Sequence, residues 1–228
     1  MDTKQHLKDL KRMLITRAFP AFKEGLKTEL DKAGELSLCN KGEILVQKGE
    51  EITHATLLLS GCLKISRENE KKQEFIITFL QAGQSFAVSV SDDSSIRNKK
   101  AFATIRATEP SYILKISYAD KDALAKKYDQ WYKYILQTAV MYYQFYIELI
   151  DNISYWNLDQ RLKYFLVQLA EIRNSKTLKI THQEIANSLN SSRESVSRLL
   201  KKLEKENKIS MNTKNIQILS SLDMGIQN

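Results

Sequence analysis

Residues 181–200 read Thr-His-Gln-Glu-Ile-Ala-Asn-Ser-Leu-Asn-Ser-Ser-Arg-Glu-Ser-Val-Ser-Arg-Leu-Leu, and this stretch decides the fold of the C-terminal part of the chain. Thr181 and Glu184 have the spacing of a capping box, in which the hydroxyl accepts from the backbone and the carboxylate reaches back. Ser191 and Glu194 repeat that spacing and predict a second helix after a short turn. Two capped helices joined in this way predict a helix-turn-helix.

The apolar residues of this stretch predict which sides of the two helices are buried. They are Ile185, Ala186 and Leu189 in the first helix, and Val196, Leu199, Leu200 and Leu203 in the second. Residues 208–211 and 215–219 alternate as strands do, and the polar residues 212–215 between them predict a hairpin. The C-terminal domain is therefore expected to be a winged helix-turn-helix.

The opposite face of the second helix carries the side chains that a helix in the major groove of DNA requires. Arginine can donate two hydrogen bonds to guanine, and glutamate can accept one from cytosine. The predicted base contacts are Arg193, Glu194 and Arg198. Hydroxyls near the turns and lysines farther along suit phosphates. The predicted phosphate contacts are Thr181, Ser191, Ser192, Ser195, Lys201 and Lys202.

The distribution of charge supports a nucleic-acid partner. The chain of 228 residues has a net charge of +8, and residues 154–228 hold twelve Lys/Arg against seven Asp/Glu, a balance of +5. A cationic surface favours polyanions, although an isolated Lys/Arg pair would be interpreted as a solvated helix face. The concentration of positive charge beside the predicted helix-turn-helix therefore favours DNA.

The N-terminal half combines helices with short strands. Residues 1–34 have helical spacing with a break near Phe19-Pro20, where proline suits the first turn of a second helix, and Gly34 ends it. Short apolar runs follow, bounded by Gly, Asn, Ser or charge, and they predict a sandwich or barrel. The runs are 43–46, 55–59, 62–65, 74–80, 101–107 and 111–116, with a hairpin loop at 67–72.

From Asp120 a long helix is expected, with apolar residues at heptad spacing. The stripe predicted to form a homodimer interface is Tyr128, Tyr132, Ile135, Ala139, Tyr142, Tyr146, Leu149 and Ile153. A second stripe lies beside it: Leu136, Val140, Tyr143, Ile147 and Ile150. The helix is expected to present one face to its own domain and another to a partner. The alternative is a single core helix with a wide apolar face.

The sequence also predicts several absences. Apolar runs fall short of the roughly 20 residues that a membrane-spanning helix needs, and the start of the chain lacks the pattern of a secretory signal, so a cytoplasmic location without a membrane partner is expected. Cys39 and Cys62 do not form a metal-ligand motif and are interpreted as structural residues. The sequence holds no nucleophile–base pair and no phosphate-cradling loop, so we expect neither an enzyme nor a metal site.

Residues 179–186 and 192–200 resemble the cyclic-AMP receptor protein and fumarate–nitrate regulator (Crp/Fnr) family. The resemblance extends over residues 41–49 and 59–65, which are similar to the glycine-punctuated turns of that family's cyclic-nucleotide-binding β-roll. It implies an α+β architecture and the same three base-contacting positions. The expected domains are a jelly-roll β-roll sensor at 1–119, a dimerisation helix at 120–154 and a winged helix-turn-helix at 155–228.

The effector site implied by the resemblance is incomplete. Members that bind cyclic nucleotides hold them with a Gly-Glu-Leu and an Arg-Ser/Thr-Ala segment, which align with residues 87–89 and 100–103 here. Neither the glutamate nor the arginine is present, so cyclic AMP is not the expected effector. Neither an iron–sulfur nor a haem cofactor is expected, because residues 1–38 hold no cysteine and lone ligands such as His54 are usually structural. The pocket for an unidentified small molecule is predicted at Phe86, Val88, Lys100 and Ala101.

These patterns predict a homodimeric transcription regulator that binds a palindromic site in double-stranded DNA, with RNA polymerase as a further partner. The alternative function is a ligand-binding or protein-interaction module of the same fold that does not recognise DNA specifically. A steep fall of DNA affinity with salt separates the two hypotheses, because it reports phosphate neutralisation.

Overall fold

The structure is a computed structural model of the chain. It describes residues 3–68, 74–87, 100–173, 175–212 and 215–222. The chain divides into two compact units, Met1–Arg67 with Ile77–Phe145 and Glu68–Ile76 with Tyr146–Asn228. Within the described residues, the helices are all too short or too polar to cross a membrane.

The N-terminal unit begins with two helices, α1 (Thr3–Ala18) and α2 (Glu24–Ala33), which confirms the helical prediction. Pro20 lies in the turn between them and not in the first turn of α2, because α2 begins later in the chain. The backbone N–H of Gly34 donates to the carbonyl of Leu30 and closes the last turn of α2, so the predicted end of the helix is correct.

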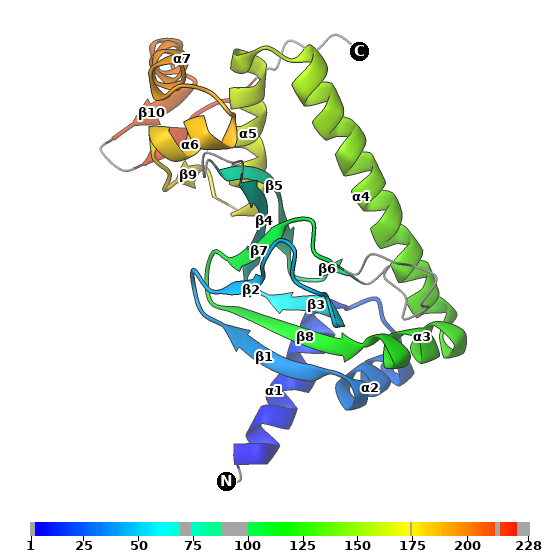
Figure 1. Cartoon of the computed structure of the whole chain (residues 1–228). Coiled ribbons are helices and arrows are strands. Elements are labelled where there is room, and N and C mark those ends of the chain that lie inside the picture. Colours follow the sequence, from blue (N-terminus) through cyan, green and yellow to red (C-terminus); the bar gives the residue numbers. More distant parts are fainter. Residues whose placement is uncertain (1–2, 69–73, 88–99, 174, 213–214, 223–228) are drawn as a thin grey trace. The chain divides into compact units, whose positions relative to one another are not determined.

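Two antiparallel four-stranded sheets form the β-roll of this unit (Figure 1). The first sheet has the order β1 (Glu35–Cys39), β8 (Ser111–Ser117), β3 (His54–Ser60), β6 (Ser85–Phe86). The second has the order β2 (Ile44–Val46), β7 (Thr104–Ala107), β4 (Cys62–Glu68), β5 (Glu74–Gln81). Each of the six predicted runs contains a strand, whereas β1 and β6 were not among them. Because β4 continues to Glu68, the predicted hairpin loop begins later than expected, and its residues 69–72 lie outside the described residues.

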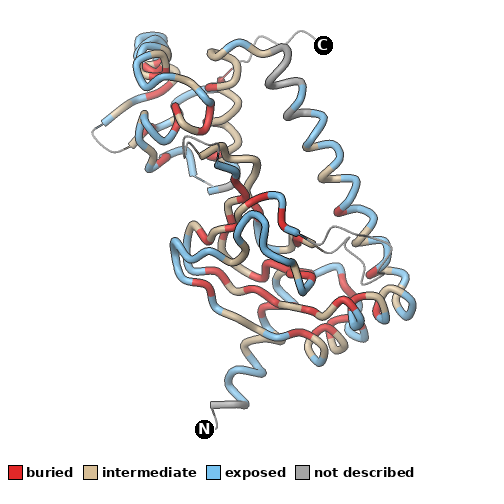
Figure 2. Tube along the Cα trace, viewed as in Figure 1, coloured by how far each residue is buried: buried red, intermediate tan, exposed pale blue. Residues whose placement is uncertain are grey.

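Two apolar clusters stabilise the unit, one on each side of the first sheet. Leu57 and Leu114 face the helices and pack with Trp131, whereas Leu58 and Ile113 face the second sheet. Successive side chains of a strand point to opposite faces, so β3 and β8 supply both clusters. Figure 2 shows the resulting concentration of buried residues along these strands.

The two cysteines are buried in the β-roll and form no disulfide, which agrees with a structural role. Cys39 belongs to the cluster between the sheets, and burial raises the pKa of its thiol. The described residues contain no group of three His, Cys, Asp or Glu side chains arranged to hold a metal ion.

The long helix predicted from Asp120 is two helices, α3 (Tyr118–Lys127) and α4 (Asp129–Tyr155). The prediction of one continuous helix is wrong because Tyr128 adopts an extended backbone conformation, with φ −125° and ψ 105°. The helix α4 still has 27 residues, or about 40 Å at 1.5 Å per residue.

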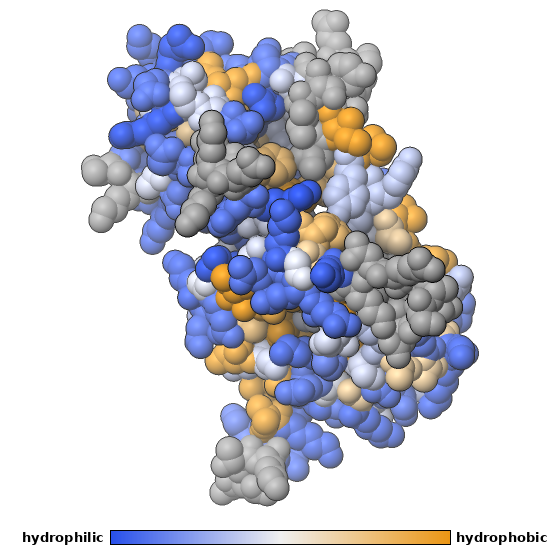
Figure 3. Space-filling view, in the orientation of Figure 1, coloured by the Kyte–Doolittle hydropathy of each residue, from blue (hydrophilic) through white to orange (hydrophobic). Residues whose placement is uncertain are grey.

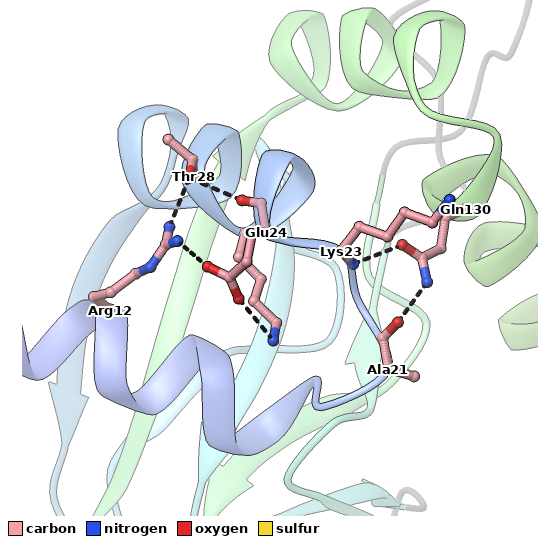
Figure 4. Close-up of polar contacts among 7 residues, drawn as sticks. Arg12, Ala21, Lys23, Glu24, Thr28 and Gln130 are labelled. Atoms are coloured by element: carbon pink, nitrogen blue, oxygen red, sulfur yellow. Dashed lines mark hydrogen bonds and ion pairs between the residues drawn. The ribbon is translucent and has the colours of Figure 1, made fainter.

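Polar contacts fix both α2 and α4 (Figure 4). The guanidinium of Arg12, on α1, lies 2.6 Å from the carboxylate of Glu24. The side-chain oxygen of Gln130 accepts from the backbone N–H of Lys23 at 2.9 Å, and its nitrogen donates to the carbonyl of Ala21 at 2.6 Å. The turn between α1 and α2 is thereby held against the start of α4.

Three residues of the predicted dimer stripe make contacts within their own unit. The hydroxyl of Tyr128 donates to the carbonyl of Gly25 at 3.4 Å, and that of Tyr142 donates to the carbonyl of Ser85 at 2.8 Å. Ile135 packs against the cluster that contains Trp131. Ile135 and Tyr142 are engaged within the chain because a helix lying on other elements must bury an apolar face of its own, and Tyr128 bonds to α2.

The other members of that stripe are divided. Tyr132, Ala139 and Tyr146 are exposed. The structure does not describe the side chains of Leu149 and Ile153. The second stripe is exposed, with fractional exposures between 43% and 67%: Leu136, Val140, Tyr143, Ile147 and Ile150. Figure 3 shows apolar side chains on the surface along α4. The exposed apolar face of α4 is thus centred on the second stripe.

A second tyrosine also bonds to β6. The hydroxyl of Tyr134 lies 3.1 Å from the carbonyl oxygen of Gly83 and 2.9 Å from the hydroxyl of Ser85. Burial raises the pKa of Tyr134 to about 12, although the hydrogen bond with Ser85 acts in the opposite direction. The phenol therefore stays protonated at neutral pH.

The C-terminal unit packs α5 (Leu158–Ile172) against a small helical and β domain. Asn157 caps α5, and the predicted apolar stripe of that helix is confirmed by the burial of Leu162, Leu166 and Leu169, with Phe165 half-buried. The remaining elements are β9 (Thr177–Leu178), α6 (His182–Ser188), α7 (Arg193–Lys205), β10 (Ile209–Met211) and β11 (Ile216–Ile218). The strands β10 and β11 pair antiparallel, which confirms the predicted hairpin, and β9 adds a third strand.

Asp159 links α5 to α7. Its carboxylate lies 2.7 Å from the ammonium of Lys163 and 3.5 Å from that of Lys202. Burial alone would raise the pKa of Asp159, but its hydrogen bonds and charge interactions with the two lysines outweigh burial, and its pKa lies below the ordinary 3.8.

Gly61 provides a test of the turn between β3 and β4. Both Gly61 and Gly42 have φ +88°, but a Cβ at Gly61 would overlap the side chain of Ser111, whereas one at Gly42 would meet nothing within 4 Å. We expect Gly42→Ala to lower the unfolding free energy by about 1–2 kcal/mol through backbone strain alone. Gly61→Ala should lower the unfolding free energy by about 1–3 kcal/mol more than Gly42→Ala does, because of the overlap. Urea denaturation measures both, and equal losses would contradict the steric argument.

Asp159 provides a test of the link between α5 and α7. We expect Asp159→Asn to lower the unfolding free energy at pH 7 by about 1 kcal/mol, because two ion pairs are lost. The contribution is complete above pH 3.8 and is lost as the pH falls through the lower pKa of the folded state. Asp129→Asn is the control, since its pair with Lys133 is exposed. Thermal unfolding that does not distinguish the two variants would refute the link.

Candidate nucleic-acid interface

The first helix of the candidate interface begins with the predicted capping box. The side chain of Thr181 accepts from the backbone N–H of Glu184 at 3.2 Å, and the carboxylate of Glu184 accepts from the backbone N–H of Thr181 at 2.7 Å. Behind this cap, Ile185 and Ala186 are fully buried. The start and the orientation of α6 are therefore as predicted.

A left-handed residue makes the turn after α6. Asn190 has φ +47°, a conformation that asparagine tolerates better than most residues. The backbone N–H of Ser191 then donates to the carbonyl of Ala186 at 2.9 Å. Arg161, on α5, donates to the carbonyl of Leu189 at 3.3 Å, so α5 also holds this turn.

The second cap is displaced by one residue from the prediction. Ser192, and not Ser191, is the N-cap of α7, because the backbone N–H of Ser191 still bonds back to α6. The hydroxyl of Ser192 accepts from the backbone N–H of Ser195 at 3.1 Å. The predicted capping box of Ser191 and Glu194 is therefore wrong.

The inner face of α7 anchors it, and the outer face is charged. Val196, Leu200 and Leu203 are fully buried, as predicted, and Leu199 is half-buried. The three predicted base contacts, Arg193, Glu194 and Arg198, are exposed. A groove of about 640 Å³ runs along this side of α7, lined by Glu194, Ser197, Arg198, Lys201, Lys202, Lys205 and Glu206. One helix thus combines a fixed backbone with arginine, lysine and glutamate side chains that are accessible.

The predicted phosphate contacts differ in the donors they offer. The hydroxyl of Thr181 donates to Glu184 at 2.7 Å, and that of Ser192 donates to Ser195 at 3.0 Å. A hydroxyl has one hydrogen, so both are used within the caps. Ser191 and Ser195 are half-buried, whereas Lys201 and Lys202 are exposed. The accessible charged donors among these residues are therefore the two lysines.

Sequence reasoning missed His182, the first residue of α6. Its Nδ1 lies 2.9 Å from the hydroxyl oxygen of Ser197 on α7. Burial lowers the pKa of His182, and the charges of Arg193 and Lys201 lower it further. The capping pattern gives no sign of this contact, because the contact joins residues fifteen positions apart in the sequence.

The residues predicted to line an effector pocket are not brought together as a described site. Phe86 is 6% exposed within the cluster between the two sheets, and Ala101 is buried. Lys100 is exposed, and its backbone pairs with Glu51. Val88 lies outside the described residues. Phe86 packs in the apolar cluster between the two sheets.

Two family models match the chain. Residues 38–128 match the cyclic nucleotide-binding domain, and residues 160–221 match the Crp-like helix-turn-helix domain. The cAMP-activated global transcriptional regulator CRP of Haemophilus influenzae is 26% identical over 181 residues, covering 76% of this chain and 79% of the relative.

Solved structures share the fold. A Crp/Fnr-family protein from Eubacterium rectale has a TM-score of 0.71 and 23% identity, over 91% of this chain and 95% of that one. The c-di-GMP responsive regulator CLP of Xanthomonas campestris has a TM-score of 0.74 and 15% identity, over 87% and 100%. With a β-roll and a capped helix-turn-helix in the order of the two matching domains, the chain belongs to the Crp/Fnr family of DNA-binding transcription regulators.

Proposed function

We propose that the protein acts as a homodimer on a palindromic DNA site, which it recognises through the outer face of α7. The observation that carries this proposal is the exposure of Arg193, Glu194 and Arg198 on a helix whose opposite face is fully buried. A rigid helix with such side chains in its first turns can reach base edges in the major groove.

Each exposed side chain has a distinct expected role. Arg193 and Arg198 would donate two hydrogen bonds each to guanine, and Glu194 would accept from cytosine. Lys201 would bind a phosphate and contribute affinity without sequence information. Lys202 would do the same, held in place by Asp159.

The exposed stripe of α4 supports a second copy of the chain as its occupant. Its five residues follow one another at spacings of four and three, the heptad pattern by which one helix packs against another. Tyr132, Ala139 and Tyr146 are exposed within one helical turn of the stripe and would widen the interface. A dimer of this kind presents two α7 helices to half-sites about 34 Å apart.

We also propose that the effector is a small molecule other than cyclic AMP, with RNA polymerase as a further partner. The Haemophilus influenzae relative is named as cAMP-activated. In this chain, however, Lys100 stands near the position where a nucleotide-binding arginine is expected, and residues 87–89 lack the glutamate that would hold the ribose. A lysine provides one point charge where arginine provides a planar fork.

Selection from random duplexes tests the DNA proposal. We expect the wild-type protein to enrich a palindrome, and Arg193→Ala or Arg198→Ala to cost about 1–3 kcal/mol at one base position and to relax the preference there. Lys201→Ala is the matched variant: it should weaken selected and random duplexes alike and lower the salt slope by about one. Unchanged preferences in both arginine variants would refute the assignment, and no DNA binding at low salt would favour the non-DNA alternative.

Sedimentation tests the dimer. We expect wild-type protein to sediment as a dimer and Val140→Glu and Ile147→Glu to sediment as monomers, because each substitution places a carboxylate in an apolar interface. Both side chains are about half exposed in the single chain, so the monomer should still fold. Gln137→Glu, at an exposed polar position of the same helix, should remain dimeric. Dimeric Val140→Glu protein would place the interface elsewhere.

A further inference from the structure

His182 joins the two helices of the helix-turn-helix at the edge of the outer face. Its Nδ1 lies 2.9 Å from the hydroxyl of Ser197, and Ser197 lines the groove along α7 together with Arg198 and Lys201. His182 is half-buried, so part of the residue remains accessible to solvent. In a helix-turn-helix the first helix crosses the DNA backbone, which brings its residues close to phosphates.

The charges around His182 favour the neutral ring in the absence of DNA. Among the described residues, the charged groups that act on it are Arg193 and Lys201, both on α7. On its own helix, Glu184 is engaged with Thr181 in the capping box. Burial first and the two cations second hold the pKa of His182 below its ordinary 6.5, so it is neutral at pH 7.

We propose that His182 is a contact to the DNA backbone that takes up a proton when DNA binds, so that DNA affinity rises as the pH falls. A phosphate brings negative charge beside the ring and favours the imidazolium form. The proton comes from the solvent and returns to it when the complex dissociates. The Nε2–H then donates to a phosphate oxygen, while Nδ1 stays on Ser197.

Ser197 suits both protonation states of the ring. When the ring is neutral, its Nδ1 can accept from the hydroxyl of Ser197; when the ring is protonated, Nδ1–H can donate to the same oxygen. Proton uptake therefore requires a rotation of the hydroxyl and no movement of either helix. The 2.9 Å distance from Nδ1 of His182 to the hydroxyl oxygen of Ser197 is within hydrogen-bond range in both arrangements.

This inference rests on the proposed function, since it concerns the same DNA-binding face. The pKa of His182 is low in the free protein and higher in the complex, so affinity is greatest below both values. DNA affinity falls as the pH rises from the lower pKa to the higher one, and it is constant above the higher pKa. Each protomer takes up at most one proton, so each His182 changes the association constant by at most about tenfold per pH unit.

Fluorescence anisotropy with the full-length protein and a labelled random-sequence DNA duplex tests the inference. Affinity is measured from about pH 5.5 to about pH 8.5 at constant low ionic strength, the range in which histidine titrates. Wild-type affinity should fall with rising pH, and His182→Gln should lose this dependence. His54→Gln, which alters an exposed histidine of the β-roll, is the matched control and should retain it.

His182→Lys distinguishes loss of the DNA contact from loss of folding. Its fixed positive charge should keep DNA affinity high at the pH where wild-type binding has weakened. Calorimetry in buffers of different ionisation enthalpy should show proton uptake by wild-type protein and less by His182→Gln. Wild-type affinity independent of pH, or a dependence that persists in His182→Gln, would overturn the inference and leave the proposed function intact. No binding of the duplex at any pH would overturn the proposed function itself.

Discussion

The burial of one side of α7 is the constraint on which the DNA-binding face depends. Val196, Leu200 and Leu203 are fully buried in a helix that contacts both α6 and β10, and this burial fixes the rotation of α7 about its axis. Because an α-helix has 3.6 residues per turn, fixing those three positions also fixes the direction of Arg193 and Arg198. The caps at both helix starts and the contact of Arg161 with the turn then limit sliding along the axis.

The helix α4 follows the same physical rule with a different outcome. Its inner face is committed to the β-roll through Trp131, Ile135 and the two tyrosines that bond to Ser85. Its outer face has apolar side chains that water surrounds. In the helix-turn-helix the outer face is charged, as a polyanion requires, whereas in α4 it is apolar, which supports the proposed second copy of the chain. The composition of the free face, and not the helix itself, distinguishes the two proposed partners.

Sequence periodicity predicted which residues share a face, but not the direction of that face. The heptads predict two neighbouring stripes, yet Tyr128 bonds to α2 and Tyr142 bonds to β6, because two parallel stripes are equivalent until the rest of the unit is placed. At α7, Ser191 and Ser192 are both suitable caps, and only the backbone bond of Ser191 to α6 decides between them. The strand β6 has only two residues and offers no alternating run, and His182 acts through a residue distant in sequence, so local patterns indicate neither. The strand β1 does alternate, from Glu35 to Leu38, and this short run could have indicated it.

The bonds of Ser85 have a mechanical consequence. Tyr134 holds its hydroxyl and Tyr142 holds its carbonyl, from positions two turns apart on α4, and Ser85 is fully buried. A displacement of β6 relative to α4 would lengthen at least one of these bonds at a residue that is fully buried. The strand β6 and the helix α4 are therefore mechanically coupled, and a movement of one is expected to move the other.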